Sequence, residues 1–319
     1  MSSRHLLDPA YQLLADTTLP PLTHDTLHSR RVLAVQLAAQ RSQTASRELD
    51  AVRVAERFVR GPAGAPYVRV LVYTPDVDAI LPPVLVHMHG GGLVMGTPEA
   101  ADLRNRRLAV DVGCVVVSVD YRLAPETRFC GAVEDCYAAL KWVHGNADAI
   151  GVDRAKIAVG GESAGGGLAA ALALLARDRN EIPVQFQLLT YPMLDDRTGS
   201  TVDAHPYAGE FVWSSASNRV GWSAALGDEL GINRMSTYLP PARAESLAGL
   251  PAAFIAVGTL DLFVEENLAY ANRLIAAGVP TELHVYPGAP HGFDAVGGAD
   301  AAKHCRQAST AALCRALGR

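Results

Sequence analysis

The sequence predicts an α/β fold in which a mostly parallel central sheet carries helices on both faces. Two observations support this prediction. From about residue 65 onward, short apolar runs alternate with longer stretches of helical periodicity. Most of the apolar runs are hydrophobic throughout, which is typical of strands that are covered on both faces. Such alternation favours parallel pairing, and in parallel sheets the functional residues gather at the carboxyl ends of the strands.

The strands are expected in seven places along the chain. The first, YVRVLVY at 67–73, alternates with a period of two, as a half-buried strand does. The others are PVLVHMH (83–89), CVVVSVDY (114–121), KIAVGG (156–161), FQLLTYP (186–192), AFIAVGT (253–259) and ELHVYP (282–287). Helices are expected at 131–147, 163–179, 264–278 and about 300–317, with Gly278 suited to ending the third in a left-handed conformation.

Two segments do not follow this rhythm. They are residues 1–65 and residues 195–245, and the second contains several aromatic residues and a helical pattern around 214–226. Both are long enough to form a lid over the sheet. Because the chain shows no internal repeat, low-complexity tract or linker, we expect residues 1–319 to form a single domain.

Composition and charge exclude several classes of protein. The chain has 319 residues and a net charge of −5, which argues against nucleic acid or an anionic membrane surface as the main partner. No apolar run reaches the roughly 18 residues that a membrane-spanning helix needs. The first residues lack a signal-peptide pattern, because Asp8 and Pro9 interrupt a short apolar run. We therefore expect a cytoplasmic protein without membrane insertion, either a monomer or a homodimer.

The cysteines predict neither a disulfide framework nor a metal site. They are odd in number, form no CxxC pattern, and lie in no His/Cys cluster with zinc spacing. Free thiols are the default in a reducing cytosol. No metal and no cofactor are expected. The five residues are Cys114, Cys130, Cys136, Cys305 and Cys314.

The strongest motif is GESAG, which matches the G-x-S-x-G pattern of a nucleophile elbow. Gly161, Glu162, Ser163, Ala164 and Gly165 follow a predicted strand and open an Ala/Leu-rich helix, as the elbow requires. Side chains at the two flanking glycines would collide with neighbouring backbone in so sharp a turn. The alternative, a glycine-rich turn that only closes a strand–helix contact, does not need this context. Phosphate binding is disfavoured, because neither GxGxxG at the first turn nor GK[ST] occurs.

A serine nucleophile needs a base, which in an elbow fold follows the serine and the acid in the chain. Of the later histidines, His284 falls within a predicted strand, His304 within the last helix, and His205 within the lid region. His291 lies in a Gly/Pro-rich loop just past the strand at 282–287 and is predicted to be the base.

The acid should follow the preceding strand, and Asp261 stands there. The alternative role for Asp261 is a helix N-cap, which would turn its carboxylate toward its own backbone. Glu265 and Glu266 are rivals within the next helix, where we expect them to meet solvent or the lid.

Four residues, His89, Gly90, Gly91 and Gly92, follow the strand at 83–89. They form either a flexible turn or a surface of bare backbone N–H groups that receives negative charge. In an elbow fold the oxyanion hole takes one N–H from the residue after the nucleophile, here Ala164, and the rest from a loop after an earlier strand. The glycine turn occupies that place, and glycine neither blocks the substrate nor restricts φ.

Taken in order, HGGG (89–92), YRLAPE (121–126), GESAGG (161–166), the Asp of DLFVEE (261–266) and HGF (291–293) resemble the hormone-sensitive-lipase-like, or bacterial family IV, esterases of the α/β-hydrolase superfamily. The resemblance covers about residues 65–319. It implies a Ser163–His291–Asp261 triad, oxyanion donors at Gly91 and Gly92, and a bracing role for His89. It also implies a cap formed by about 1–45 and 195–240.

The resemblance further implies that the substrate is a small carboxylic ester with a short to medium acyl chain, cleaved without a cofactor through an acyl-enzyme. This chain departs from the family pattern at Met88, at Leu262 and at 129–131, and none of these positions belongs to the triad. Met88, just before the HGGG histidine, is expected to affect substrate preference. A lipase or amidase with the same triad, and a non-catalytic small-molecule receptor of the same fold, are the alternatives. A receptor would be expected to lack the triad histidine or acid, and this chain has both.

Overall fold

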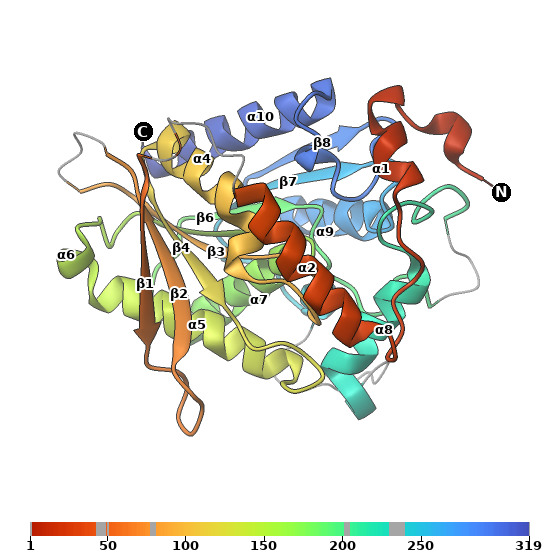
Figure 1. Cartoon of the computed structure of the whole chain (residues 1–319). Coiled ribbons are helices and arrows are strands. Elements are labelled where there is room, and N and C mark those ends of the chain that lie inside the picture. Colours follow the sequence, from red (N-terminus) through yellow and green to blue (C-terminus); the bar gives the residue numbers. More distant parts are fainter. Residues whose placement is uncertain are drawn as a thin grey trace.

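The computed structural model describes residues 2–42, 49, 51–76, 81–200, 205–229 and 240–318. Within these residues the centre is an eight-stranded sheet with the strand order β1-β2-β4-β3-β5-β6-β7-β8 (Figure 1). The strands are β1 Arg53–Val59, β2 Val68–Thr74, β3 Val84–Met88, β4 Val115–Asp120, β5 Ile157–Glu162, β6 Phe186–Thr190, β7 Ala252–Gly258 and β8 Thr281–Tyr286. β1 pairs antiparallel with β2, and β2 pairs antiparallel with β4. The neighbours from β4 through β3 to β8 pair parallel. The predicted α/β architecture is therefore confirmed.

Helices cover both faces of the sheet. They are α1 Gln12–Asp16, α2 Leu27–Ser42, α4 Asp102–Val112, α5 Phe129–Gly145, α6 Ala147–Ile150, α7 Ala164–Arg179, α8 Ser215–Leu226, α9 Val264–Ala276 and α10 Asp300–Leu317. α5 and α7 lie on one side and α4 and α10 on the other (Figure 1). Two apolar clusters fill these two layers, one centred on α5, α7 and α9 and the other on α4 and α10. Gly278 follows α9 with φ +77°, as predicted.

Among the strands and α-helices of the described residues, β1, α1, α2, α4 and α6 were not predicted from the sequence. Two of them, β1 and α4, have a clear physical reason. β1 is an edge strand with only Val59 buried along its length, so it shows no apolar pattern. The buried side of α4 carries the polar residues Asp102 and Asn105 beside its apolar ones, so the hydrophobic stripe of this helix is incomplete. The other predicted strands and helices agree with the structure to within about two residues, which is the usual uncertainty at element ends.

The two segments outside the alternating pattern contact each other. The Leu22 N–H donates to Ser217 Oγ (2.9 Å), and the Val212 N–H donates to Thr18 Oγ1 (3.1 Å). In Figure 1 the N-terminal chain runs along α8. Residues 1, 43–45, 201–204 and 230–239 of the predicted cap lie outside the described residues.

Candidate active site

The nucleophile turn joins β5 to α7 at the carboxyl edge of the sheet. Ser163 adopts φ 56° and ψ −122°, a backbone conformation that residues other than glycine rarely adopt. A Cβ on Gly161 would lie 2.3 Å from the Met88 carbonyl oxygen, and one on Gly165 would lie 2.0 Å from the same oxygen. Both glycines are therefore required by close backbone approach, as the sequence predicts.

The structure brings the three predicted catalytic side chains together. Ser163 Oγ lies 2.9 Å from His291 Nε2, and His291 Nδ1 lies 2.8 Å from Asp261 Oδ2. Ser163 and His291 are each 7% exposed, and Asp261 is fully buried. Ser163 follows β5, Asp261 follows β7 and His291 sits in the loop after β8, so three strand ends along one edge of the sheet supply the three groups. Such a chain can take a proton from serine and stabilise the imidazolium that results.

Asp261 combines two roles that the sequence treats as alternatives. While Oδ2 faces His291, Oδ1 accepts a hydrogen bond from the Phe263 N–H (3.0 Å). One oxygen thus holds the turn before α9 and the other orients the imidazole. The rival Glu265 is exposed and Glu266 is buried. Glu266 accepts hydrogen bonds from the Leu194 N–H (2.7 Å) and from Thr198, a residue of the predicted cap segment, so it meets the cap rather than the triad, as expected.

The glycine turn lies against the nucleophile turn. A Cβ on Gly90 would lie 3.1 Å from the Glu162 carbonyl oxygen and 3.5 Å from Ser163 Cβ. The Val94 and Met95 N–H groups donate to the Gly91 carbonyl and close the turn. In the described part of the chain, the N–H groups of Gly91, Gly92 and Ala164 donate to no protein acceptor. These unsatisfied donors are available to an oxyanion.

His89 is held as a neutral structural group beside this turn. His89 Nδ1 lies 2.8 Å from the Gly90 carbonyl oxygen, and the imidazole stacks on the Tyr121 ring with the centroids 4.3 Å apart. The Tyr121 hydroxyl donates a hydrogen bond to the His89 carbonyl oxygen (2.7 Å). Burial lowers the pKa of His89 to about 4. His89 is therefore uncharged at neutral pH.

Other histidines lie apart from this chemistry. His87 on β3 is buried and contacts Ser118 Oγ (3.1 Å) and Glu162, so it is a hydrogen-bonded core residue. His284 lies on β8 and His304 on α10, as predicted. No group of three or more His, Cys, Asp or Glu residues in the described ranges could hold a metal ion.

Sequence reasoning missed three side chains that shape the site. Tyr191, at the end of β6, packs its ring 4.7 Å from the His291 ring. Trp213, before α8, lies against Gly92, since a Cβ on that glycine would come within 2.2 Å of the indole. Arg104, on the unpredicted helix α4, contacts Glu162 and Asp294. Sequence alone offers no signal for these contacts, because each joins segments far apart in the chain.

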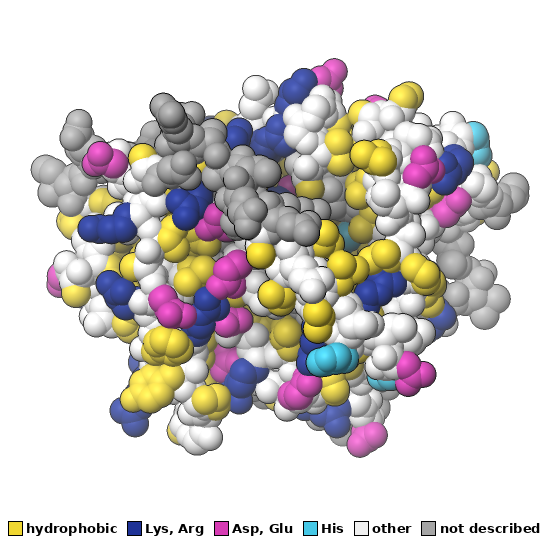
Figure 2. Space-filling view, viewed as in Figure 1, with side chains coloured by type: hydrophobic (Ala, Val, Ile, Leu, Met, Phe, Trp, Pro, Cys, Tyr) yellow, Lys and Arg dark blue, Asp and Glu magenta, His cyan; other side chains and the backbone are white. Residues whose placement is uncertain are grey.

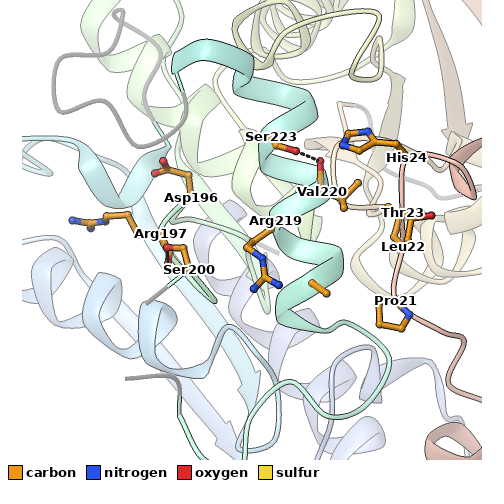
Figure 3. Close-up of a pocket in the computed structure, with 11 residues that line it drawn as sticks. Pro21, Leu22, Thr23, His24, Asp196, Arg197, Ser200, Arg219, Val220 and Ser223 are labelled. Atoms are coloured by element: carbon orange, nitrogen blue, oxygen red, sulfur yellow. Dashed lines mark hydrogen bonds between the residues drawn. The ribbon is translucent and has the colours of Figure 1, made fainter. Parts of the chain in front are cut away.

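A cavity of about 510 Å³ lies between the N-terminal segment and α8 (Figure 3). Its lining is mostly drawn from Pro21–His24 and from α8, with additions from the loop after β6. In Figure 3, Pro21, Thr23 and His24 face Val220 and Ser223 across it. The cavity marks the seam where the two segments outside the alternating pattern meet.

Comparison with known proteins gives a consistent result. Residues 85–295 match a family model described as the alpha/beta hydrolase fold. The chain is 38% identical to esterase LipI of Mycobacterium tuberculosis over 76% of this chain and 75% of that protein. It is 36% identical to carboxylesterase NlhH of the same organism over 90% and 88%.

Solved structures agree with these sequence relatives. A bacterial heroin esterase has a TM-score of 0.91 at 37% identity and covers 98% of both chains. Esterase LipW of Mycobacterium marinum has a TM-score of 0.88 at 35% identity, covering 99% of this chain and 97% of that one.

Proposed function

This chain belongs to the α/β-hydrolase family, and we propose that it is a serine carboxylesterase in which Ser163, His291 and Asp261 act as the triad. The observation that carries the proposal is the continuous Ser163–His291–Asp261 hydrogen-bond chain, with distances of 2.9 and 2.8 Å. The esterase names of its relatives and structural neighbours support the same activity. No helix among the described residues is long and apolar enough to cross a membrane.

The mechanism follows from the geometry. His291 Nε2 takes the Ser163 proton as Oγ attacks the ester carbonyl carbon, and the carbonyl π electrons move to oxygen. The Gly91, Gly92 and Ala164 N–H groups then stabilise this oxyanion. The imidazolium gives its proton to the departing alkoxide, leaving an acyl-enzyme and a free alcohol. Water, deprotonated by His291, attacks the acyl carbon, and Oγ leaves with the proton, which releases the acid.

The proposed substrates are small esters with short to medium acyl chains. Two observations support this size range. The nucleophile and base are almost buried, which leaves little room for a bulky group. Trp213 also stands against the Gly92 side of the oxyanion turn.

We further propose that residues 1–45 and about 195–240 form a cap over this site within a single domain. The hydrogen bonds between the two segments and the cavity at their seam support this arrangement. Arg31 on α2 adds a direct link to the site, because Nε donates to the Val94 carbonyl (2.7 Å) and its guanidinium pairs with Glu126. A cytoplasmic location and a monomeric or homodimeric state stay predictions.

The function is tested with p-nitrophenyl esters from acetate to octanoate. We expect turnover that is highest for the short and medium chains, that is abolished in Ser163→Ala, and that is blocked by a serine-directed phosphonate. The Ser163→Ala variant should unfold at the same temperature as wild type. Absence of hydrolysis by purified wild-type protein across the whole series would exclude the proposal.

A lipase is the second candidate, because apolar side chains lie exposed on α2. Val32 and Val35 are each about half exposed (45% and 52%), and Figure 2 shows apolar groups among charged ones on the face that carries α2. A lipase would cleave emulsified long-chain triacylglycerol faster than soluble short esters. We expect the reverse order of rates, and measuring both substrates on the same preparation separates the two.

A further inference from the structure

Arg104 joins the two loops that carry the nucleophile and the base. Its Nη1 lies 3.0 Å from Glu162 Oε1, and its Nη2 contacts Asp294 Oδ2. Glu162 immediately precedes Ser163, and Asp294 follows His291 by three residues. Arg104 itself comes from α4, on a different part of the chain, and touches neither reacting side chain.

Both carboxylates depend on a nearby cation. The Glu162 side chain is 13% exposed and that of Asp294 is 2% exposed. Burial alone would raise the pKa of Glu162, but the charge of Arg104 and the hydrogen bond with His87 outweigh burial and lower the pKa to about 2. Without a guanidinium between them, two poorly solvated negative charges would repel each other and push the two loops apart.

Asp294 is linked through Tyr191 to the base, His291. Its Oδ1 accepts a hydrogen bond from the Tyr191 hydroxyl, and its carbonyl accepts from Arg306 Nη1 (3.0 Å). The same Tyr191 also packs its ring against the His291 ring. The position of the imidazole therefore depends on Asp294, which in turn is tied to the nucleophile turn through Arg104.

We propose that Arg104 is a positioning residue that keeps Ser163 Oγ and His291 Nε2 at hydrogen-bonding distance by bridging Glu162 and Asp294. This inference rests on the proposed function, since that distance matters only if serine and histidine exchange a proton. Displacing a reacting group by about 1 Å typically costs on the order of 10² in rate. The loss should fall on kcat, because Arg104 does not contact the substrate-binding surface formed by the glycine turn.

The test compares Arg104→Met with Arg106→Met, a control on the same helix. Arg106 pairs with Asp102 (2.9 Å) and with the carbonyls of Leu49 and Val52, and so makes comparable contacts away from the catalytic loops. For Arg104→Met we expect kcat to fall about 10²-fold with KM changed less than about threefold. The rate of inactivation by a serine-directed phosphonate should fall in parallel. Arg106→Met should alter thermal stability only.

Two further variants separate positioning from a general packing effect. In Arg104→Met/Glu162→Gln/Asp294→Asn the two negative charges, and with them the repulsion, are gone. We expect its kcat to be at least tenfold higher than that of Arg104→Met. Arg104→Lys keeps one charge but cannot bridge both carboxylates, so its kcat should lie between those of wild type and Arg104→Met. If Arg104→Met does not fold, Arg104→Lys and the triple variant carry the comparison.

The outcomes are distinct from those of the esterase test. Wild-type protein that hydrolyses no ester removes the proposed function. Active wild type with an Arg104→Met variant that retains the kcat of Arg106→Met overturns the positioning role alone. A loss of kcat that the triple variant does not restore also overturns it, because the bridge would then not be the cause.

Discussion

Adding one methyl group at Gly92 should disable the oxyanion turn while leaving the protein folded. Gly92 has φ +61°, in the left-handed region, and a Cβ built there would lie 2.2 Å from Trp213 Cη2 and 2.6 Å from Cζ2. These atoms belong to the end of a side chain that can move. Gly91 differs, because its φ is +129° and its Cβ would lie 2.0 Å from the Met95 carbonyl oxygen, which is backbone of the same turn.

The expected magnitudes follow from these contacts. An alanine in the left-handed conformation costs about 1–2 kcal/mol of stability, which is a modest part of the roughly 5–15 kcal/mol that holds a domain folded. The indole and the turn must also separate, which moves the Gly92 N–H away from the oxyanion. Losing one such donor typically costs about 3–4 kcal/mol in the transition state, or 10²–10³ in kcat.

The assay measures kcat for p-nitrophenyl butyrate and the unfolding temperature of each variant. Gly151→Ala is the matched control, because Gly151 has φ +69° and no atom lies within 4 Å of its built Cβ. It should lose a similar amount of stability and keep wild-type kcat. In Gly92→Ala/Trp213→Ala the methyl has room, and we expect kcat to rise at least tenfold above that of Gly92→Ala.

A Gly92→Ala variant with the kcat of Gly151→Ala would refute the assignment of the Gly92 N–H as a donor. Gly91→Ala is a less informative change, because a Cβ there would lie 2.0 Å from the Met95 carbonyl oxygen. Gly91→Ala should destabilise the turn and lower kcat together, so Gly92 separates the two effects better.

The remaining predictions concern the carboxylates. Asp261→Asn would present an NH₂ group or a weaker acceptor to His291 Nδ1, and we expect kcat to fall about 10³–10⁴-fold with little change in unfolding temperature. Asp261→Ala should also lower the unfolding temperature, because the hydrogen bond from the Phe263 N–H is lost. The pKa of Glu162 is lowered in the folded state to about 2 from an ordinary value of 4.5, so its contribution to stability is present above pH 4.5 and is lost as the pH falls toward 2. The difference in free energy of unfolding between wild type and Glu162→Gln should therefore be largest at neutral pH and shrink below pH 4.5, as urea titrations at pH 7 and pH 3 would measure. An equal difference at both pH values would contradict the charge pairing.

Much of the fold and candidate site could be predicted because the determining interactions are local. A glycine-flanked serine between a strand and a helix needs only a few consecutive residues to form the turn, and the φ of 56° at Ser163 follows from that geometry. Parallel strands then bring their carboxyl ends to one edge, so residues that follow successive strands meet there. Asp261 and His291 could be chosen as partners of Ser163 on this ground.

Other features depend on contacts between distant segments. The two roles of Asp261 were separate alternatives in the sequence, but the carboxylate has two oxygens, and the structure directs one to Phe263 and the other to His291. Glu266 lies on a helix and could have faced solvent, but the loop after β6 folds over it.

The sequence by itself determined the α/β architecture and the order of nucleophile, acid and base, because backbone periodicity and turn chemistry act over a few residues. Only the tertiary structure decided that Arg104 bridges Glu162 and Asp294, and that Trp213 lies on Gly92. The apolar stripe of α4 is too incomplete for the helix to be recognised from sequence. An arginine that reaches the catalytic loops also cannot be told apart in sequence from one that faces solvent on a helix. Which side chain reaches the catalytic loops is set by the packing of whole helices on the sheet, and that packing is a sum over many weak contacts along the entire chain.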